Sequence, residues 1–510
     1  MKSEKKLSRL AAWRRIAAGL VLLGVTALFL DASGIARYFL GWLARIQLLP
    51  AIMAANLAVI AVIAVVTLLF GRIYCSVICP LGIFQDGVSH LSGLRSGGSR
   101  KLRFGWKPER KWLRYTVFGV FVLALVFGVH ALVALLAPYS AYGRMVSNLL
   151  QPVWLWGNNL LAKIAEHYDS YAFYTRDVWL KSLPTLIVAG VTFVALSVLA
   201  WWNGREYCNS ICPVGTALGF FSRFAMFRPV IDASKCKDCR LCEKGCKASC
   251  IDISSHKIDY SRCVDCFNCL GACKFDALHY RFGWTGGHKG VSDASDGQAA
   301  DPGRRAFLTG AAMLAGTLTV DAQRKKFDGG FAVLVEKREP QRSGRLVPPG
   351  AGSPKEFYSK CTACGLCIAV CSNGVLRPSK DLEHLMQPYM SYERGYCRPE
   401  CTACGDVCPT GAILPLKAPQ KSDIHIGIAE VDYDLCVVNR DGVNCGNCAR
   451  HCPAKAIHMV PKEEDSKLRI PSVDASLCIG CGACEYLCPS RPYSAIHVNG
   501  REKHLNSSEL

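Results

Sequence analysis

Cysteine thiols are the reactive groups that dominate this sequence, which has 29 of them among 510 residues. Twenty-four of them stand in six runs of four, most with two residues between neighbouring cysteines and three before the last. This spacing is too tight for a disulfide framework and suits thiolates that wrap a metal cluster. Such thiols must be reduced when the sites are assembled, which predicts assembly in a bacterial-type cytosol.

Two copies of one run lie close together in the middle of the chain. They comprise Cys236, Cys239, Cys242 and Cys246, and then Cys263, Cys266, Cys269 and Cys273. In bacterial ferredoxins three close thiolates grip one [4Fe–4S] cluster, and the fourth ligates the other cluster. The spacing therefore predicts that Cys273 completes the first cluster and Cys246 the second. A pair of zinc sites is the alternative, but zinc favours separated cysteine pairs over three cysteines in one short loop.

Four more runs follow in the last third of the chain. They comprise Cys361, Cys364, Cys367 and Cys371; Cys397, Cys401, Cys404 and Cys408; Cys436, Cys445, Cys448 and Cys452; and Cys478, Cys481, Cys484 and Cys488. They predict four further cubes, and hence six [4Fe–4S] clusters in the chain. Nested pairing would join the outer two runs and the inner two, whereas sequential pairing would join neighbours. We expect nesting, because the compact outer runs resemble each other.

A cube closed by four thiolates leaves no coordination position for a substrate. The six runs therefore predict one-electron transfer rather than catalysis by a stand-alone enzyme.

Four apolar stretches in the first half approach the length of about 20 residues that a membrane-spanning helix needs. They cover residues 16–30, 46–70, 112–137 and 183–202. Lys and Arg crowd the N-terminus and the loop between the second and third stretches, but are sparse over 138–182, where aromatic residues gather. The positive-inside rule therefore predicts a cytoplasmic N-terminus. Six clusters of about −2 each would offset roughly 12 charges of the net +20. The remaining excess is attributed to this topology signal, and no nucleic-acid partner is expected.

A short motif occurs twice among these stretches, starting at Gly71 and again at Gly204. It contains two cysteines with three residues between them and a following proline: Cys75 and Cys79, then Cys208 and Cys212. Cysteines at this spacing share one face of a helix. The four thiols could form one further metal site or two redox-active dithiols, and a purely structural role is the alternative. The repeat also predicts two helix hairpins related by a pseudo-twofold axis along the membrane normal.

Two single residues complete the set of candidates. His130 is the only histidine within a predicted span, which excludes a bis-histidine haem there. An ionisable group inside a bilayer is a candidate for a quinone site, with a hydrogen bond inside the bundle as the alternative. Cys250 belongs to no run and is interpreted as a buried structural thiol.

The two Cys-x-x-x-Cys-Pro motifs and the two-cluster runs, over about residues 10–280, resemble the NapH/MauN family of ferredoxin-type membrane proteins. The twin-arginine-like start at Arg304-Arg305 and the four later runs resemble the NapG/MauM family, so the chain looks like a fusion of the two. The resemblance implies a membrane subunit that takes electrons from quinol. That subunit would pass them to an exported ferredoxin, which feeds a periplasmic reductase.

The expected fold is an α-helical membrane bundle of four transmembrane helices, with a fifth possible, plus α+β bacterial-type ferredoxin domains. The expected domains are a membrane unit (1–225), a two-cluster domain (226–282), a linker with a twin-arginine-like apolar segment (283–355, the segment at 304–322) and a four-cluster domain (356–510). A crossing at 306–320 would put the last domain in the periplasm. That stretch is short for an anchor, and without the crossing all six clusters stay in the cytoplasm.

These features predict an electron relay in the bacterial inner membrane. Its expected partners are the lipid bilayer, the quinone pool or a cytosolic donor, and a periplasmic or membrane-associated reductase. The alternative is a protein of redox sensing, or of metal and cofactor assembly, that uses its clusters and Cys-Pro thiols.

Overall fold

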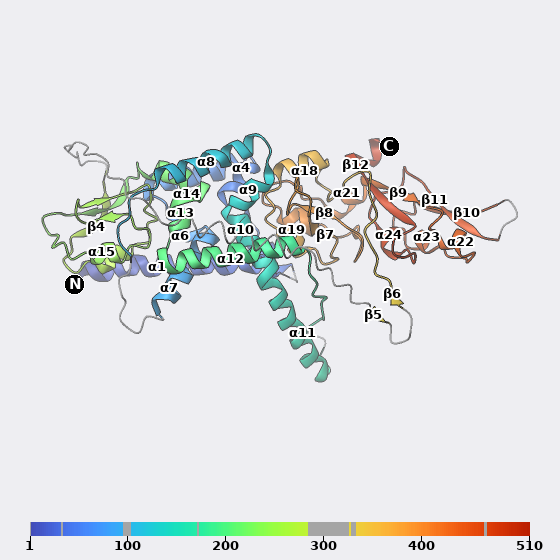
Figure 1. Cartoon of the computed structure of the whole chain (residues 1–510), viewed down its shortest axis with the longest axis horizontal. Coiled ribbons are helices and arrows are strands. Elements are labelled where there is room, and N and C mark those ends of the chain that lie inside the picture. Colours follow the sequence, from blue (N-terminus) through green and yellow to red (C-terminus); the bar gives the residue numbers. More distant parts are fainter. Residues whose placement is uncertain are drawn as a thin grey trace, which may run out of the picture.

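The structure is a computed structural model that describes residues 2–31, 34–94, 104–170, 173–283, 326–327, 333–463 and 467–509. The described parts form an elongated molecule with a helical bundle at its centre and a cysteine-rich unit with small sheets at each end (Figure 1). This arrangement confirms a mostly helical first half joined to small-sheet ferredoxin-like units. The twin-arginine-like segment, 304–322, lies outside the described residues.

The bundle is built from two consecutive halves. The first contains α1 (Lys2–Leu30), α2 (Ile35–Leu40), α3 (Trp42–Arg45), α4 (Leu48–Met53), α5 (Leu57–Phe70), α6 (Ile73–Val77) and α7 (Pro80–Leu94). The second contains α8 (Lys111–Val126), α9 (His130–Leu136), α10 (Pro138–Met145), a π-helical turn η1 (Val146–Leu150), α11 (Gln151–His167), α12 (Leu183–Asn203), α13 (Glu206–Ser210) and α14 (Pro213–Ser222).

The two halves exchange their last helices. α7 packs on α12 of the second half, and α14 packs on α5 of the first half. In the same way α1 contacts α6 and α7, while α8 contacts α13 and α14. Each of these contacts in one half has a counterpart in the other, which is the arrangement that a pseudo-twofold repeat requires.

Two helices in the described residues are long and apolar enough to cross a membrane, Leu10–Leu30 within α1 and Leu183–Asn203, which is α12. The second and third expected spans are not continuous. α5 begins afresh where the Asn56 side chain accepts the Val59 N–H (3.2 Å), and α8 ends just before Gly128, which has a φ of +75°. At 1.5 Å per residue α5 extends about 21 Å, less than the roughly 30 Å of a hydrocarbon core.

The first cysteine-rich unit follows the bundle directly. It contains β1 (Phe227–Ile231), α15 (Leu241–Lys244), β2 (Ile251–Asp252), β3 (Lys257–Ile258), α16 (Asn268–Ala272) and β4 (Leu278–Phe282). β1 pairs antiparallel with β4, and β2 with β3. The chain therefore enters and leaves this unit on the same small sheet.

The second cysteine-rich unit lies at the other end of the bundle. It contains α18 (Pro354–Lys360), α19 (Leu366–Val370), β7 (Leu376–Pro378), β8 (Pro388–Met390), α20 (Ala403–Val407), α21 (Ala418–Ser422), β9 (Ile424–Val431), α22 (Val437–Arg440), α23 (Asn447–Arg450), β10 (Ile457–Pro461), β11 (Arg469–Val473), α24 (Ala483–Leu487), β12 (Ile496–Asn506) and a terminal 3-10 turn η3 (Ser507–Glu509). Antiparallel pairs join β7 to β8, β9 to β12 and β10 to β11. A separate two-stranded pair, β5 (Lys326–Phe327) and β6 (Val333–Leu334), precedes it.

Residues 341–355, the last part of the segment expected to be a linker (283–355), belong to this unit. Leu346 and Val347 are buried, and the Leu346 carbonyl accepts the Met390 N–H (3.0 Å). Arg342 forms a buried ion pair with Glu485 (2.6 Å). The expectation that the linker extends to residue 355 is therefore wrong, because these contacts cover the core of the unit.

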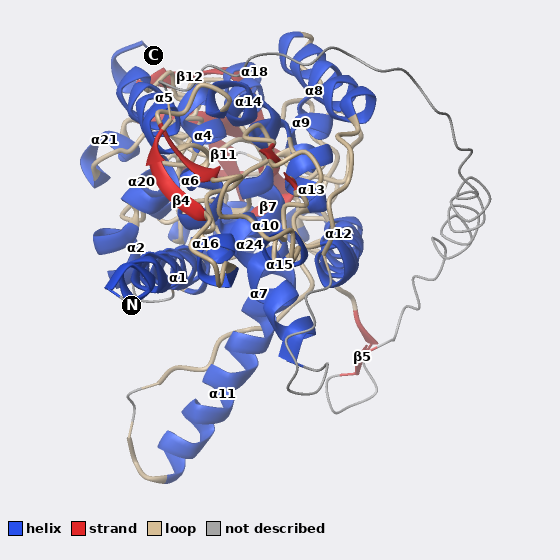
Figure 2. Ribbon diagram, turned by 90° about the vertical axis from the view of Figure 1, so that its left-hand side faces the viewer, coloured by secondary structure: helices blue, strands red, loops and turns tan. Residues whose placement is uncertain are grey.

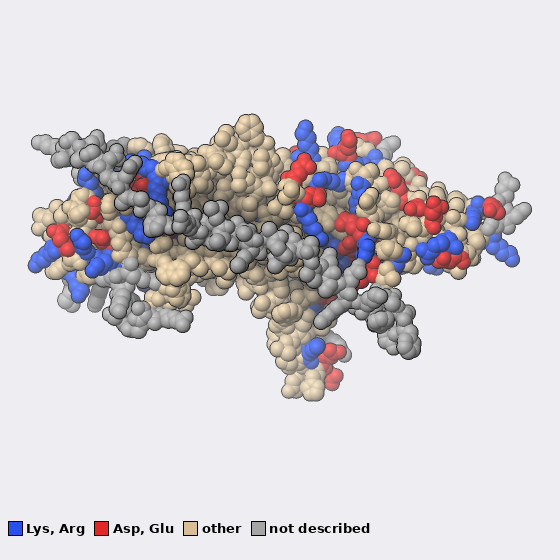
Figure 3. All heavy atoms as spheres, viewed as in Figure 1, with Lys and Arg blue, Asp and Glu red and all other residues tan. Residues whose placement is uncertain are grey.

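Charged side chains are concentrated at the two ends of the molecule and are sparse on the bundle between them. On the face shown in Figure 3, Lys, Arg, Asp and Glu gather over the two cysteine-rich ends and at the tip of α11, and the visible surface over the rest of the bundle carries almost none. Large apolar side chains of the bundle are exposed instead, such as Leu20, Leu57 and Phe127. α11 projects away from the body, as Figures 1 and 2 both show.

Candidate metal centres

The first cysteine-rich unit brings its eight run cysteines together as two groups of four. Cys236, Cys239, Cys242 and Cys273 line one hollow. Cys246, Cys263, Cys266 and Cys269 line another. The exchange of the fourth thiol between the runs, which the spacing predicts, is confirmed.

In the second unit neighbouring runs pair with each other. Cys436, Cys445, Cys448 and Cys488 line one hollow, and Cys452, Cys478, Cys481 and Cys484 line the next. The thiols of Cys361, Cys364 and Cys367 lie close enough to Cys408 for their charges to interact, as do those of Cys397 and Cys404 with Cys371. The expectation of nested pairing is therefore wrong.

The packing of short helices explains the sequential pairing. α19 and α20 each lead into the fourth cysteine of a run, and so do α23 and α24. α19 packs on α20, and α23 packs on α24. Each packed pair of helices therefore places the fourth cysteine of each run beside the other run of the pair. Resemblance between distant runs does not reveal which helices pack together.

Four of the six runs share one loop conformation that suits a metal cube. The residues directly before and after the second cysteine have positive φ: Asp238 and Arg240, Asp265 and Phe267, Ala363 and Gly365, and Gly480 and Gly482. Left-handed backbone at non-glycine residues is costly and persists where the surroundings demand it. Here it accompanies the convergence of three sulfurs on one hollow.

The protonation chemistry of the thiols also fits a metal. Burial raises the pKa of Cys481 to about 12 and that of Cys448 to about 11. Backbone N–H groups donate to the sulfurs of Cys273 and Cys452 at 3.3 Å. All cysteines of the chain are free rather than joined in disulfides. Buried thiols of this kind ionise against a bound cation, so the residues present fit [4Fe–4S] clusters.

The Cys-Pro cysteines of the two repeats also come together, inside the bundle. Cys75 lies on α6 and Cys208 on α13, and Cys79 and Cys212 directly precede α7 and α14. All four are buried. The charge of the Cys79 thiolate would interact with Cys75 and Cys208, and that of Cys212 with the other three. The structure thus assembles one group of four thiols rather than two separate pairs.

Two buried arginines, one from each repeat, hold this group in matching ways. Arg72 Nη2 donates to the carbonyl of Cys208 (3.1 Å) and points at the sulfur of Cys75 (3.8 Å). Arg205 Nη1 donates to the carbonyl of Cys75 (2.7 Å) and points at the sulfur of Cys208 (3.9 Å). Each guanidinium therefore ties its own repeat to the other one.

Comparison with known proteins shows what these cysteine groups are similar to. A model described as a 4Fe-4S binding domain matches residues 52–99 and 183–230, and a 4Fe-4S dicluster domain matches 360–412 and 443–491. The C-terminal region is 35% identical over 184 residues to the methylamine utilization ferredoxin-type protein MauM of Methylobacillus flagellatus, covering 35% of this chain and 77% of the relative. It is 36% identical over 186 residues to MauM of Paracoccus denitrificans (35% and 82%), and 32% identical over 198 residues to the ferredoxin-type protein NapG of Escherichia coli (36% and 81%).

The chain belongs to the MauM/NapG family of ferredoxin-type proteins. It is an iron–sulfur electron-transfer protein with multiple [4Fe–4S] clusters. The first dicluster match covers two neighbouring runs, and the second covers the last run and the last three cysteines of the run before it, in agreement with the sequential pairing. No solved structure matches the chain significantly.

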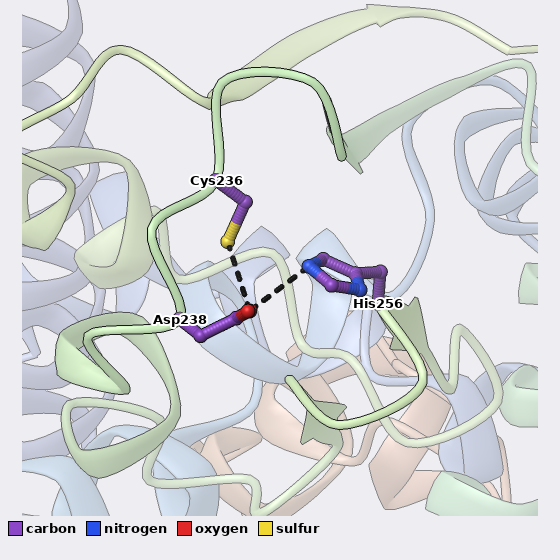
Figure 4. Close-up of side chains that lie close together, drawn as sticks. All are labelled: Cys236, Asp238 and His256. Carbon is purple, nitrogen blue, oxygen red and sulfur yellow. Dashed lines mark hydrogen bonds and ion pairs between the residues drawn. The ribbon is translucent and has the colours of Figure 1, made fainter.

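Beside the first quartet of this MauM/NapG-type chain lies a group that sequence reasoning missed (Figure 4). The Asp238 carboxylate lies 3.0 Å from His256 Nε2 and 3.7 Å from Cys236 Sγ. The three ligand atoms lie within 4.8 Å of one another. Because Cys236 also lines the hollow of its quartet, Asp238 and His256 are interpreted as polar neighbours of that centre. The acidic residue before the second cysteine, repeated at Asp265, is the sequence signal for them.

Cys250 lies directly beside a thiol quartet, whereas His130 lies at the end of the bundle nearest the second cysteine-rich unit. Cys250 is buried as expected, but its sulfur lies 3.6 Å from Cys246 Sγ and it lines the second quartet's hollow. His130 starts α9 at the break in the third apolar stretch, close enough to His384 of the second cysteine-rich unit for their charges to interact. It therefore lies near the end of the bundle that carries the later runs.

Proposed function

We propose that this protein is a membrane-bound relay that carries single electrons through six [4Fe–4S] clusters from one side of the bacterial inner membrane to the other. The observation that carries the proposal is the placement of two cysteine-rich units at opposite ends of an apolar-faced bundle (Figures 1 and 3). The donor is the quinol pool or a cytosolic reductant, and the acceptor is a periplasmic or membrane-associated reductase.

Direct contacts hold each cysteine-rich unit against the bundle. At the first end, Arg72 Nη1 donates to the Ser261 carbonyl (3.0 Å) and Asn209 Nδ2 to the Ala248 carbonyl (3.0 Å). α1 contacts α16 at this end and α19 at the other, so one helix runs the length of the bundle. The two units are therefore fixed to a shared frame rather than tethered loosely.

At the second end the contacts are of a different kind. Gln151 Nε2 donates to the Ala369 carbonyl (3.0 Å), which joins α11 to α19. The Trp179 ring lies under the guanidinium groups of Arg377 (4.8 Å) and Arg394 (4.9 Å). This aromatic anchor comes from the loop that the positive-inside rule assigns to the outer face.

The apolar belt and the lysine and arginine pattern support a membrane location with the N-terminus in the cytoplasm. In this topology the unit at 226–283 is cytoplasmic and the unit at 333–509 is periplasmic, with the twin-arginine-like segment between them. The first half then does the work of a NapH/MauN-type membrane subunit and the second that of a NapG/MauM-type ferredoxin, fused in one chain. His130, at the outer end of the bundle, is the candidate residue of a quinone site.

When bound, the clusters supply one-electron carriers that need no substrate position. The chain's own residues bury them and place cations beside the thiolates. Lys421 Nζ donates to the carbonyls of Arg398 (2.5 Å) and Cys401 (2.6 Å), near the Cys397 thiol. Lys337 Nζ donates to the carbonyls of Glu485 (2.5 Å) and Tyr486 (2.8 Å), near Cys488. Such charges and hydrogen bonds tune reduction potentials.

Transfer across a sealed bilayer tests the relay. The anaerobically purified chain is reconstituted in liposomes with ferricyanide trapped inside, and dithionite is added outside. We expect ferricyanide reduction that depends on the protein and falls to the background rate in the Cys364→Ser variant. Reduction of the clusters without any reduction of trapped ferricyanide would overturn the transmembrane relay, as would an alkaline phosphatase fusion after Leu510 that is inactive while a cytoplasmic reporter there is active.

The alternative of metal delivery or redox sensing by the Cys-Pro thiols is less well supported. A thiol that hands a metal to another protein must be reached by that protein, and all four of these thiols are buried. Thiol-dependent metal transfer to a partner, without transmembrane electron transfer, is the outcome that would favour it.

A further inference from the structure

We infer that Cys75, Cys79, Cys208 and Cys212 together hold a seventh, iron-containing redox centre inside the bundle, between the two cysteine-rich units. The inference rests on the proposed electron relay and supplies an intermediate redox centre between its two cysteine-rich units. Each 4Fe-4S binding domain match contains only two of these cysteines, so neither repeat alone supplies the four thiolates of a closed cluster. The packing of the two halves supplies all four at one place.

The sulfurs are surrounded by N–H donors, as sulfurs that bind iron are. The Gly215 N–H donates to Cys212 Sγ (3.4 Å), and the Gly82 N–H faces Cys79 in the same way in the other repeat. Gln85 Nε2 donates to Cys208 Sγ (3.3 Å). With the two guanidinium groups, each sulfur of the group has a donor directed at it.

The charge balance favours a metal over four neutral thiols. Arg72 and Arg205 are fully buried, and a buried cation needs an opposite charge. Arg205 shares Asp86 with Lys247 and Arg14 (2.7, 2.8 and 3.1 Å), and Arg72 lies beside the buried carboxyl of Asp265, so the cations outnumber the carboxyl groups. A centre with a core charge of about +2 on four thiolates carries about −2, and offsets both guanidinium groups.

The position of the group suits a stepping stone between distant clusters. On one side, the Lys247 carbonyl accepts the Arg205 N–H (2.9 Å), and the Lys247 ammonium interacts with Cys266 of the second quartet. On the other side, buried Tyr74 lies close enough to Cys79 and to Tyr139 for their charges to interact. Tyr139 in turn lies within such reach of Cys364 and Cys408.

A series of buried groups thus leads from the second quartet, which contains Cys246, through the four bundle thiols to the quartet of Cys361, Cys364, Cys367 and Cys408. Electron tunnelling decays exponentially with distance, so a redox centre here would make a transfer through the bundle fast. The centre accepts one electron from the Cys246 quartet and passes one electron to the Cys364 quartet. No bond forms or breaks, and the donor of the relay supplies the electron.

Metal content and spectroscopy of the full-length chain test the centre without any activity measurement. Iron, zinc and acid-labile sulfide are determined on anaerobically purified protein, together with redox-titrated EPR spectra. We expect iron above the roughly 24 atoms of six four-iron cubes, and one signal that disappears in the Cys79→Ser/Cys212→Ser double variant. The matched control is Ser210→Ala, which removes a buried hydroxyl from α13 that bonds Glu206 and should keep every signal.

A second variant keeps the inference testable if the double variant does not fold. Arg72→Lys retains all four thiols but loses the planar guanidinium between Cys208 and Cys75. It should shift the midpoint potential of the bundle signal and leave the signals of the second cysteine-rich unit unchanged. Unchanged iron and spectra in the folded double variant, or zinc in this site of the wild type, would overturn the inference. A failed liposome assay with the bundle signal present would instead contradict the transmembrane relay.

Discussion

The thiol groups at the two ends of the molecule and the one inside the bundle are built in different ways. In four of the six runs, three thiols of an end quartet come from one short loop, and the left-handed residues lie within that loop. The bundle group takes two thiols from each of two motifs that lie far apart in the sequence, and arginines from both repeats join them. Loop geometry therefore builds the end quartets, whereas packing of the repeats builds the bundle group.

Removing one end ligand should have the largest effect. Cys266→Ser should lose the second quartet's cluster, and with it about four iron atoms per chain. Its matched control is Cys250→Ser, which changes a buried thiol that lines the same hollow without belonging to a run. The measurement is iron and sulfide content with EPR. Loss of a cluster from the Cys250 variant and not from the Cys266 variant would reverse the assignment of ligands.

The bundle group should depend instead on the charges packed around it. Burial alone would raise the pKa of Asp86, but Arg205 and Lys247 hold it well below its ordinary range. Asp86→Asn leaves buried cations uncompensated and should lower the free energy of unfolding by about 3–5 kcal/mol. Because a carboxyl with a depressed pKa loses its contribution only as the pH falls through that pKa, the loss should be the same between about pH 6 and pH 8.

Denaturant unfolding in detergent micelles measures this effect, with Asp441→Asn as control. Asp441 pairs with Arg440 on the surface, and its substitution should leave stability unchanged. Equal destabilisation by both substitutions would mean that the charges around Asp86 do not support the bundle group.

Alanine substitutions at two glycines on α7 separate the effect of close contact between the repeats from the effect of helix propensity on stability. A Cβ at Gly82 would lie 2.7 Å from Arg205 Nη1 and would also meet the Cys75 carbonyl. Gly82→Ala should therefore lower the free energy of unfolding by about 1–3 kcal/mol. Gly87→Ala, with no atom within 4 Å of its Cβ, should raise it by up to about 1 kcal/mol. Stabilisation by both changes would contradict the tight contact between repeats.

The smallest effect is expected where the bundle meets the second end unit. Trp179→Leu removes the ring beneath Arg377 and Arg394 and should weaken docking by about 1–2 kcal/mol. Hydrogen exchange should then quicken over 366–378 while β9 and β12 keep their protection. Trp154→Leu, at an exposed position on α11, is the control and should change neither region.

Much of this protein could be predicted from its sequence because cysteine spacing is a local property. Three cysteines within one short loop can wrap one metal cube. The same spacing predicts that Cys246 and Cys273 each ligate the cluster of the other run. The duplicated motif likewise predicts a bundle of two related halves. These features require no knowledge of how distant segments pack.

Tertiary structure alone decided the rest. Which runs pair depends on which short helices pack, so resemblance between the outer runs pointed to the wrong partners. The breaks at Asn56 and Gly128 depend on a capping side chain and a left-handed residue inside apolar stretches that look continuous. The meeting of Cys79 with Cys208 depends on helices exchanged between the halves, and burial of Leu346 on a surface formed by later residues. Spacing specifies what a loop can hold, whereas long-range packing specifies which loops meet.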